Sequence, residues 1–285
     1  MIKKNNMPHF DFVEIGTSDF DTILETASDT DIGLSIDIIK QYLDILPDKS
    51  NCIKCNTAIS DKNGDIDIYY IPPDKIGKYN LPDWVRGCNT IGKPHPTVLS
   101  LLSNLGINQE DIIDHSKVEM VSFENLVHRF DIVGINILKI DTEGHDCVIL
   151  NNYCDVLDKN PSLRANEIYF ESNELISRQD LTDVLRRLFT YGYDLISSDS
   201  NTILRLPISS IDLSSDQKKY DRCYIEGYPF GYDINNLPHD NTLESSLKYA
   251  ESINAHGITY QNGLFTVRKG RYLIRESLDI YSIVV

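Results

Sequence analysis

Apolar and polar residues alternate in blocks along the first two-thirds of the chain, and these blocks predict strands and helices in turn. Short apolar runs rich in β-branched residues predict strands over residues 10–15, 33–37 and 135–140. Apolar residues at helical spacing predict helices between the strands, most clearly over residues 180–190. This alternation predicts an α/β domain whose sheet is mostly parallel, with an antiparallel last strand.

Turn and cap residues predict the remaining elements of this region. The connection over residues 71–96 holds five prolines, and connections of this length inside a domain are usually lids or binding loops. The other predicted elements are a helix from about Asp19, a helix over 38–46, strands over 51–58 and 65–70 joined by a hairpin at Asn63–Gly64, a helix over 97–105, a helix from Ser122 to Phe130, a helix over 143–157 capped by Thr142, and strands over 193–197 and 202–206.

The pattern changes in the last third of the chain. Residues 209–219 are mostly polar and predict a linker. Residues 241–254 follow the spacing of an amphipathic helix, and a short β-meander is predicted over residues 258–274. We therefore predict two domains, an α/β domain over residues 1–207 and a small α+β appendage of unknown role over residues 208–285.

Composition limits the classes of partner. The 285 residues are 41% apolar, which is enough for a sizeable core, and the net charge is −16. A charge of this sign argues against binding to nucleic-acid phosphates or to anionic membranes. No apolar run resembles a signal peptide or reaches membrane-spanning length, and the six cysteines show no disulfide framework. A cytoplasmic protein with reduced cysteines is therefore expected.

The most informative segment is Ile137–Asp146, with the sequence ILKIDTEGHD. An apolar strand ends there, and three acids, a threonine and a histidine follow at its carboxyl end. Open α/β sheets bind ligands at the edge formed by the carboxyl ends of their strands. Taken alone, the segment is also compatible with an ordinary acidic turn between a strand and a helix.

A second segment near the amino terminus adds a possible cofactor site. The strand over residues 10–15 ends at Gly16, and the helix predicted to follow would direct backbone N–H groups toward a ligand. The dinucleotide pattern G-x-G-x-x-G is missing, because Gly16 is the only glycine present. The next strand ends at Asp37, whose carboxylate could accept both hydroxyls of a ribose. A nucleoside cofactor such as S-adenosylmethionine (SAM) fits better than a dinucleotide.

These segments resemble the FkbM-type SAM-dependent methyltransferases. Residues 139–146 match the KIDxEGHE-like segment of that family, and residues 14–20 correspond to its first motif, DVGANxG. Residues 34–38 and 56–60 correspond to its second and third strands. The similarity covers about residues 8–207. The chain departs from the family pattern in the first motif, where an aspartate and a phenylalanine stand at positions 19 and 20, and after the second strand, where Asp-Ile replaces Glu-Pro.

The resemblance implies a Rossmann-like class I methyltransferase sheet with SAM as cofactor, and O-methylation of a hydroxyl on a sugar, a glycan or another small acceptor. Asp37 would hold the ribose, Glu14, Gly16 and Ser18 would line the methionine side, and residues 56–59 would border the adenine. The expected cofactor-binding residues are Glu14, Gly16, Thr17, Ser18, Asp37, Ile38, Asn56, Ala58, Ile59 and Asp141.

Several residues are candidates for the chemistry of methyl transfer. A hydroxyl is a weak acid, so a general base helps the reaction. Asp141 is the first choice for a side chain near the methyl group, followed by Glu143 and His145. His95, in the proline-rich connection, is an alternative base. Some other sugar O-methyltransferases use a divalent metal, and Asp141, Glu143 and Glu171 could supply oxygen ligands, so a metal is possible but unassigned.

Two other classes of function stay open from the sequence. The departures in the first motif are compatible with a non-catalytic glycan- or protein-binding protein on a degenerate methyltransferase fold. A nucleotide-sugar enzyme is a weaker alternative, because no phosphate-binding loop is present. The residues do not select the acceptor or the oligomeric state.

Overall fold

The computed structural model describes residues 9–18, 20–198 and 200–207, and within the last third of the chain residues 218–219, 222–226, 228–230, 233–234, 242–253, 255, 257–261, 264–268, 272–274 and 281–284. The chain divides into two compact units. The first consists of residues 1–191 and 195–204, and the second of residues 192–194 and 205–285.

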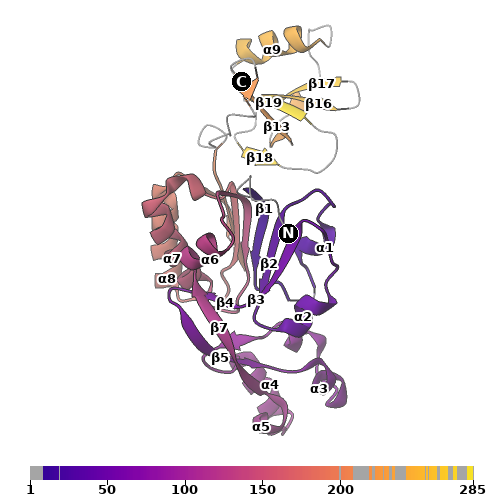
Figure 1. Ribbon diagram of the computed structural model, residues 1–285, viewed down its shortest axis with the longest axis vertical. Helices are drawn as coiled ribbons and strands as arrows, with labels where there is room; N and C mark the ends of the chain where they lie inside the picture. Colours follow the sequence, from indigo (N-terminus) through magenta and orange to yellow (C-terminus); the bar gives the residue numbers. More distant parts are fainter. Residues whose placement is uncertain are drawn as a thin grey trace. The chain divides into compact units, whose positions relative to one another are not determined.

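A seven-stranded sheet forms the centre of the first unit (Figure 1), with the strand order β10-β11-β9-β8-β1-β2-β3. Neighbouring strands from β9 to β3 are parallel. Only two residues separate β10 from β11, so these neighbours are antiparallel, because a parallel crossover needs about a dozen residues. The strands are β1 His9–Ile15, β2 Gly33–Asp37, β3 Cys52–Asn56, β8 Gly134–Ile140, β9 Glu167–Glu171, β10 Asp194–Ser198 and β11 Asn201–Arg205.

Helices cover both faces of this sheet. Figure 1 shows α6, α7 and α8 on one side and α1 and α2 on the other. On the latter side, Phe12 of β1 packs with Leu24 and Leu43 in one buried cluster. The mixed α/β architecture with a mainly parallel central sheet is therefore confirmed. The helices are α1 Ile23–Thr26, α2 Lys40–Ile45, α6 Phe123–Arg129, α7 Asp146–Lys159 and α8 Arg178–Thr190, with a 3-10 turn at Pro161–Leu163.

The prediction of one strand over residues 51–58 is wrong. The chain leaves the main sheet after β3 and enters a second, four-stranded sheet at β4 (Ala58–Ser60), with Thr57 between the two. The Thr57 hydroxyl donates to the carbonyl of Glu119 at 2.8 Å, which anchors this change of sheet. The contact joins residues 62 positions apart, so no local pattern indicates it.

The hairpin predicted at Asn63–Gly64 is also wrong. In the second sheet, with the order β4-β7-β5-β6, strand β7 (Asp114–Ser122) lies between β4 and β5 (Gly64–Tyr70). Asn63 Oδ1 instead accepts a hydrogen bond from the backbone N–H of Ser122 at 2.9 Å. The turn residues therefore join strands that do not pair with each other.

The long connection over residues 71–96 is folded rather than irregular. It contains α3 (Pro73–Lys78), a 3-10 helix η1 (Asp83–Arg86) and β6 (Thr90–Ile91), and α4 (Pro96–Asn104) and α5 (Gln109–Ile112) follow it. Figure 1 shows α3, α4 and α5 beyond β5 and β7, at the end of the first unit. Their shared buried cluster consists of Ile71, Ile76, Leu81, Val85, Val98, Leu102 and Ile112.

Helix α1 begins later than predicted. Its first residue is Ile23 rather than about Asp19, because Thr22 is the capping residue and its side chain accepts from the N–H of Leu24. The helix therefore starts seven residues after Gly16 rather than about three.

Helix α7 also begins later, at Asp146 rather than at residue 143. Glu143 and Gly144 have φ values of 52° and 93°, which lie in the left-handed region and outside a right-handed helix. Thr142 does not cap the helix, because its hydroxyl donates to Asp146 Oδ2 at 2.8 Å. The acidic segment after β8 is therefore a turn rather than the first turn of a helix.

The second unit contains a six-stranded sheet with the order β12-β13-β19-β16-β17-β15 and a two-stranded sheet of β14 and β18. Strand β18 pairs with β14 and not with β17, so the predicted three-stranded meander is wrong in its third strand. Most of the predicted linker over residues 209–219 lies outside the described residues. The elements are β12 Lys218–Lys219, β13 Arg222–Glu226, β14 Tyr228–Phe230, β15 Asp233–Ile234, α9 Leu243–Ser252, β16 Gly257–Gln261, β17 Leu264–Arg268, β18 Tyr272–Ile274 and β19 Tyr281–Val284.

Helix α9 packs on this sheet through Ala250, which shares a buried cluster with Ile258 of β16 and Val267 of β17. Assigning this unit the role of a separate appendage stays a prediction. Within the described part of both units, no helix is at once long enough and apolar enough to cross a bilayer.

Candidate active site

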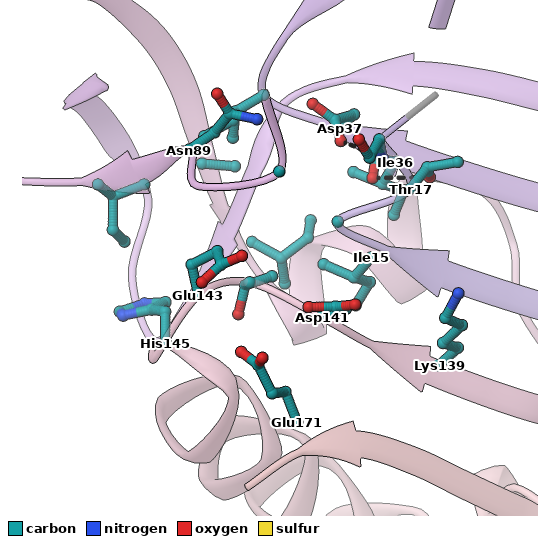
Figure 2. A pocket seen from close by; sticks show the side chains of 18 of the residues that line it. Ile15, Thr17, Ile36, Asp37, Asn89, Lys139, Asp141, Glu143, His145 and Glu171 are labelled. Carbon is teal, nitrogen blue, oxygen red and sulfur yellow. Dashed lines mark hydrogen bonds between the residues drawn. The ribbon is translucent and has the colours of Figure 1, made fainter. Parts of the chain in front are cut away.

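One cavity of about 380 Å³ lies at the carboxyl ends of the parallel strands (Figure 2). Gly16, Asp37 and Asp141, which follow or end β1, β2 and β8, all line it. Ligand pockets of small molecules typically measure roughly 300–1,000 Å³, so this cavity can enclose a ligand of nucleoside size. The three strand ends that the sequence singles out therefore meet at one site.

Gly16 joins the turns after β1 and β8. Its φ is 82°, and a Cβ atom at this position would lie 1.7 Å from the carbonyl oxygen of Asp141. The N–H of Gly16 donates to the carbonyl of Ile36, and the N–H of Asp141 donates to that of Ile15, both at 2.9 Å. A side chain at position 16 would separate these strand ends, which explains the glycine.

Asp37 is fixed by the backbone of two turns. The N–H of Ser18 donates to Oδ2 at 2.7 Å, and the N–H of Ile39 donates to Oδ1 at 2.6 Å. Thr17 is buried and donates its hydroxyl to the carbonyl of Ile36 at 3.0 Å, which holds the same turn. The two bonds from Ser18 and Ile39 fix the orientation of the carboxylate at the lining of the cavity.

Glu14 lies below the cavity and not on its surface. Its side chain is fully buried, accepts from the Thr22 hydroxyl at 2.7 Å and pairs with Lys139 at 3.1 Å. Burial raises the pKa of this carboxyl, and the charge of Lys139 lowers it. Glu14 thus connects β1 to the start of α1 and to β8.

Of the other residues expected at the cofactor, one lies outside the cavity and the rest line it. Asn56 is exposed and outside the cavity lining, and its side-chain N–H donates to the backbone carbonyl of Asp37 at 2.9 Å. The expected cofactor residues that do line the cavity are Gly16, Thr17, Ser18, Asp37, Ile38, Ala58, Ile59 and Asp141.

Three carboxylates crowd one end of the cavity. Oxygens of Asp141, Glu143 and Glu171 lie within 4.8 Å of one another, and Figure 2 shows these three groups facing a common space. Asp141 opens into the cavity but is surrounded by protein, and this desolvation, with the charges of Asp146 and Glu143, raises its pKa to about 7. Burial and the charges of Glu143 and Asp141 raise the pKa of Glu171 to about 8. Such a cluster can exchange a proton near neutral pH, and its oxygens are also of the type that a hard divalent cation binds.

Asp146, the last acid of the motif, is structural. It is fully buried and accepts from the Thr142 hydroxyl at 2.8 Å and from the N–H of Glu171 at 3.2 Å. Burial raises its pKa to about 6. These bonds tie the turn after β8 to the end of β9, which brings Glu171 to the site.

His145 lines the cavity, but Figure 2 shows its ring directed away from the three carboxylates. Its Nε2 lies 2.9 Å from the Ser60 hydroxyl, and burial lowers its pKa, which favours the neutral ring at pH 7. His95 is buried outside the cavity lining, and its Nε2 lies 3.1 Å from Glu143 Oε2. His145 therefore contacts the end of β4 through Ser60, whereas His95 contacts the acidic turn after β8 through Glu143.

The folded connection provides one wall of the cavity. Trp84, Cys88 and Asn89 line it, and the Tyr42 hydroxyl donates to the carbonyl of Arg86 at 2.9 Å, which pins this segment to α2. Phe20 lines the cavity and is 39% exposed, and a volume of about 380 Å³ is left open beside it. Sequence patterns mark the segment as a lid, but they contain no signal for the contact made by Tyr42.

Several polar atoms at the cavity have no partner. Within the described part of the chain, five side-chain polar atoms are buried without a hydrogen bond, and three belong to cavity residues: Ser18 Oγ, Asn89 Oδ1 and Glu171 Oε2. Unsatisfied buried polar groups are costly and therefore rare. Their concentration here favours a polar ligand that completes their hydrogen bonds.

Comparison with known proteins identifies the family. The model of the methyltransferase FkbM domain matches residues 36–195, which is more than half of the chain and includes Asp37, the acidic turn and Glu171. Neither a curated protein nor a solved structure gives a significant match. The chain therefore belongs to the FkbM methyltransferase family.

Proposed function

We propose that this protein is a SAM-dependent O-methyltransferase that acts on a hydroxyl of a sugar, a glycan or another small acceptor. Membership of a methyltransferase family implies SAM as the methyl donor. The observation that carries the proposal is the single cavity lined by Gly16, Asp37 and Asp141. The strand order β3-β2-β1-β8-β9-β11-β10 supports a Rossmann-like class I sheet, in which ligands bind at the carboxyl edge.

The residues of the cavity fit an adenosyl group. Asp37 is fixed in place and would accept the ribose hydroxyls, and Ser18 Oγ and Asn89 Oδ1 would gain the partners that they lack. Ile38, Ala58 and Ile59 provide an apolar border for the adenine. Glu14 and Asn56, below and beside the cavity, would support these residues without touching the cofactor.

The acidic end of the cavity suits the reacting atoms. Bound SAM supplies a methyl group on a positively charged sulfur. Asp141, at the end of the central strand, would lie nearest to this group, and the negative cluster would favour binding of the positively charged cofactor. An acceptor hydroxyl must lose its proton during transfer, and Asp141, Glu143 and His145 are the candidate bases. A divalent cation held by Asp141, Glu143 and Glu171 would be an alternative way to activate the hydroxyl.

The residues of the cavity also argue against a non-catalytic binding protein and against a nucleotide-sugar enzyme. A non-catalytic binding protein would not need a crowded acidic cluster in which desolvation of Asp141 and Glu171 destabilises the fold. A nucleotide-sugar enzyme would need cations or N–H groups for a diphosphate, and Lys139, the one lysine among the described lining residues, pairs with Glu14. Both observations favour methyl transfer.

Titration calorimetry with SAM and S-adenosylhomocysteine tests the cofactor assignment. We expect Asp37→Ala to weaken binding by about ten- to a hundredfold, or roughly 1.4–2.7 kcal/mol, because charge-assisted hydrogen bonds to the ribose are lost. The matched control is Asp44→Ala, an exposed acid on the following helix that pairs with Lys40. Equal affinities of Asp37→Ala and wild type would refute the ribose assignment. A folded wild type that binds neither molecule would favour the non-catalytic alternative.

A screen for methyl transfer tests the acceptor class. Incubation of the protein and SAM with a panel of free sugars and glycosides, read by mass spectrometry, should give a product heavier by one methylene group. Transfer only to amines or thiols in a parallel panel would contradict the O-methyltransferase assignment.

A further inference from the structure

His95 connects the folded connection to the acidic end of the cavity. It is 6% exposed and is the capping residue of α4. Its Nδ1 accepts a hydrogen bond from the backbone N–H of Thr97 at 3.1 Å, and its Nε2 lies 3.1 Å from Glu143 Oε2. Both ring nitrogens are therefore engaged, one by the backbone and one by a residue of the cavity.

These two contacts determine the tautomer of His95. A backbone N–H can only donate, so Nδ1 must present its lone pair to Thr97. In a neutral imidazole the proton is then on Nε2, which donates to Glu143 Oε2. Nε2 has no lone pair left, so His95 is not placed to act as the general base that the sequence suggests.

The same tautomer argues against a zinc site. Cys88, His95 and Glu143 offer ligand atoms within 4.8 Å of one another. A histidine that binds metal through Nε2 normally carries a proton on Nδ1 and donates it to a nearby acceptor. Here Nδ1 faces a donor, so metal binding through Nε2 would leave the ring without any proton. The geometry favours a hydrogen bond between His95 and Glu143.

Glu143 needs such a restraint. Its φ of 52° is uncommon for a residue other than glycine and strains the backbone. The neighbouring Gly144, with φ 93°, packs against Leu175, where a Cβ atom would lie 3.0 Å from the leucine Cβ. The turn therefore directs the side chain of Glu143 into the cavity, and the bond from His95 fixes one oxygen of its carboxylate. Because Nε2–H can only donate, Oε2 must accept, and Figure 2 shows the Glu143 carboxylate near those of Asp141 and Glu171.

From this geometry we infer that His95 is a positioning residue, which orients Glu143 to take the proton from the acceptor hydroxyl. The inference rests on the proposed methyl transfer. In that step the acceptor oxygen forms a bond to the methyl carbon, and the carbon–sulfur bond breaks with its electron pair staying on sulfur. The hydroxyl proton passes to Glu143 Oε1 and then to water, so His95 itself neither gains nor loses a proton.

Nuclear magnetic resonance of the ¹⁵N-labelled full chain tests the contact without any ligand. The ring nitrogens of His95 are assigned from the signals that disappear in His95→Asn. We expect an unprotonated Nδ1 and a protonated Nε2, and a change of the Nε2 signal in Glu143→Gln. A protonated Nδ1, or an Nε2 signal that is the same in Glu143→Gln, would overturn the inference.

Two substitutions separate positioning from helix capping. Asparagine at position 95 keeps an acceptor for the N–H of Thr97, since asparagine is a preferred capping residue, but it loses the donor to Glu143. Glutamine keeps an N–H near the position of Nε2 and loses the cap. With SAM and an acceptor from the sugar panel, we expect His95→Asn to lower kcat about ten- to a hundredfold at unchanged KM for SAM. His95→Gln should recover most of kcat although it melts at a lower temperature.

The reverse order of activity, with His95→Asn near wild type and His95→Gln impaired, would show that His95 only caps α4 and would overturn the inference. Titration with S-adenosylhomocysteine separates this failure from failure of the proposed function. If wild type and both variants bind it equally, the kinetic comparison decides the role of His95. If the folded wild type does not bind it, methyl transfer and the catalytic role of Glu143 both fall, whatever the tautomer of His95.

Discussion

Carboxylates lie at both ends of the cavity, along the same edge of the same sheet, but their surroundings differ. At one end, both oxygens of Asp37 accept short hydrogen bonds from backbone N–H groups. At the other end, Asp141 and Glu171 lie beside further acids, and their pKa values are raised to about 7 and about 8. One end presents a carboxylate oriented by backbone donors, and the other is suited to exchange a proton.

The turns that follow the strands cause this difference. The turn after β1 has Ser18 in a left-handed conformation, with a φ of 54°, and directs its N–H to Asp37. The turn after β8 instead directs carboxylates into the cavity, and the bonds of Asp146 bring Glu171 beside them. Parallel strands thus supply a common edge, and the turn conformations decide the chemistry at each point along it.

Gly16→Ala should have the largest effect on stability and binding, because it would push apart the turns after β1 and β8, which carry the two ends of the cavity. The new Cβ would lie 1.7 Å from the carbonyl oxygen of Asp141 at a φ of 82°. We expect a loss of about 2–4 kcal/mol in the free energy of unfolding, measured by urea denaturation, and loss of S-adenosylhomocysteine binding. Gly106→Ala is the matched control, since Gly106 also has a positive φ, of 65°, but a Cβ there meets no atom within 4 Å. Equal losses in the two variants would mean that backbone strain alone, and not the junction of the turns, explains the glycine.

A smaller change, Glu171→Gln, should sharpen the contrast between the ends. The pKa of Glu171 is raised from 4.5 to about 8, so the folded protein binds more protons than the unfolded chain between these values. The contribution of this group to the free energy of unfolding therefore falls as pH rises from about 4.5 to about 8. Glutamine stays uncharged, so the variant should gain stability over wild type across this range, on the order of 1–2 kcal/mol at pH 8 after allowance for solvent screening.

Glu119→Gln is the control of opposite sign. A hydrogen bond and the charge of Arg129 lower the pKa of Glu119, so glutamine there should slightly destabilise the protein above about pH 5. Denaturation curves at several pH values measure both variants. If the stability difference between Glu171→Gln and wild type did not change with pH, the pKa of Glu171 would not be raised by burial and the neighbouring acids.

The smallest effect is expected at the cofactor end, for Asn89→Ala. Asn89 Oδ1 is buried without a partner, while its amide N–H donates to the carbonyl of Arg86 at 2.8 Å. If a cofactor hydroxyl or amine completes this site, alanine should weaken S-adenosylhomocysteine binding about three- to tenfold, or roughly 0.7–1.4 kcal/mol. Asn104→Ala, on the exposed end of α4, should leave the affinity unchanged. Unchanged affinity in Asn89→Ala would remove this residue from the cofactor site.

The strands are the elements that the sequence predicts best. The predicted ranges 10–15, 33–37 and 135–140 agree within one residue with β1, β2 and β8, because strands buried on both faces give continuous apolar runs. The starts of α1 and α7 are wrong because Asp21 and Glu143 adopt left-handed conformations that their residue types do not indicate. The division between β3 and β4 is missed because it depends on a hydrogen bond from Thr57 to a carbonyl 62 residues away.

The candidate site, like the fold, is predicted from the sequence only where it depends on local patterns. Side chains at the ends of parallel strands can be assigned to one edge from the sequence, and Gly16, Asp37 and Asp141 do meet there. The place of Glu14 below the cavity and the contact between His95 and Glu143 depend on segments that are distant in the chain. Local patterns carry no information about such contacts.

The sequence by itself determined the family, the positions of the main strands along the chain and the acids that end them, because these follow from periodicity and from a short motif within one segment. Only the tertiary structure decided which acids face backbone N–H groups, which face one another, and which nitrogen of His95 carries the proton. The physical reason is that hydrogen-bond partners and desolvation are set by neighbours in space, and in this protein those neighbours come from segments as far as 125 residues apart.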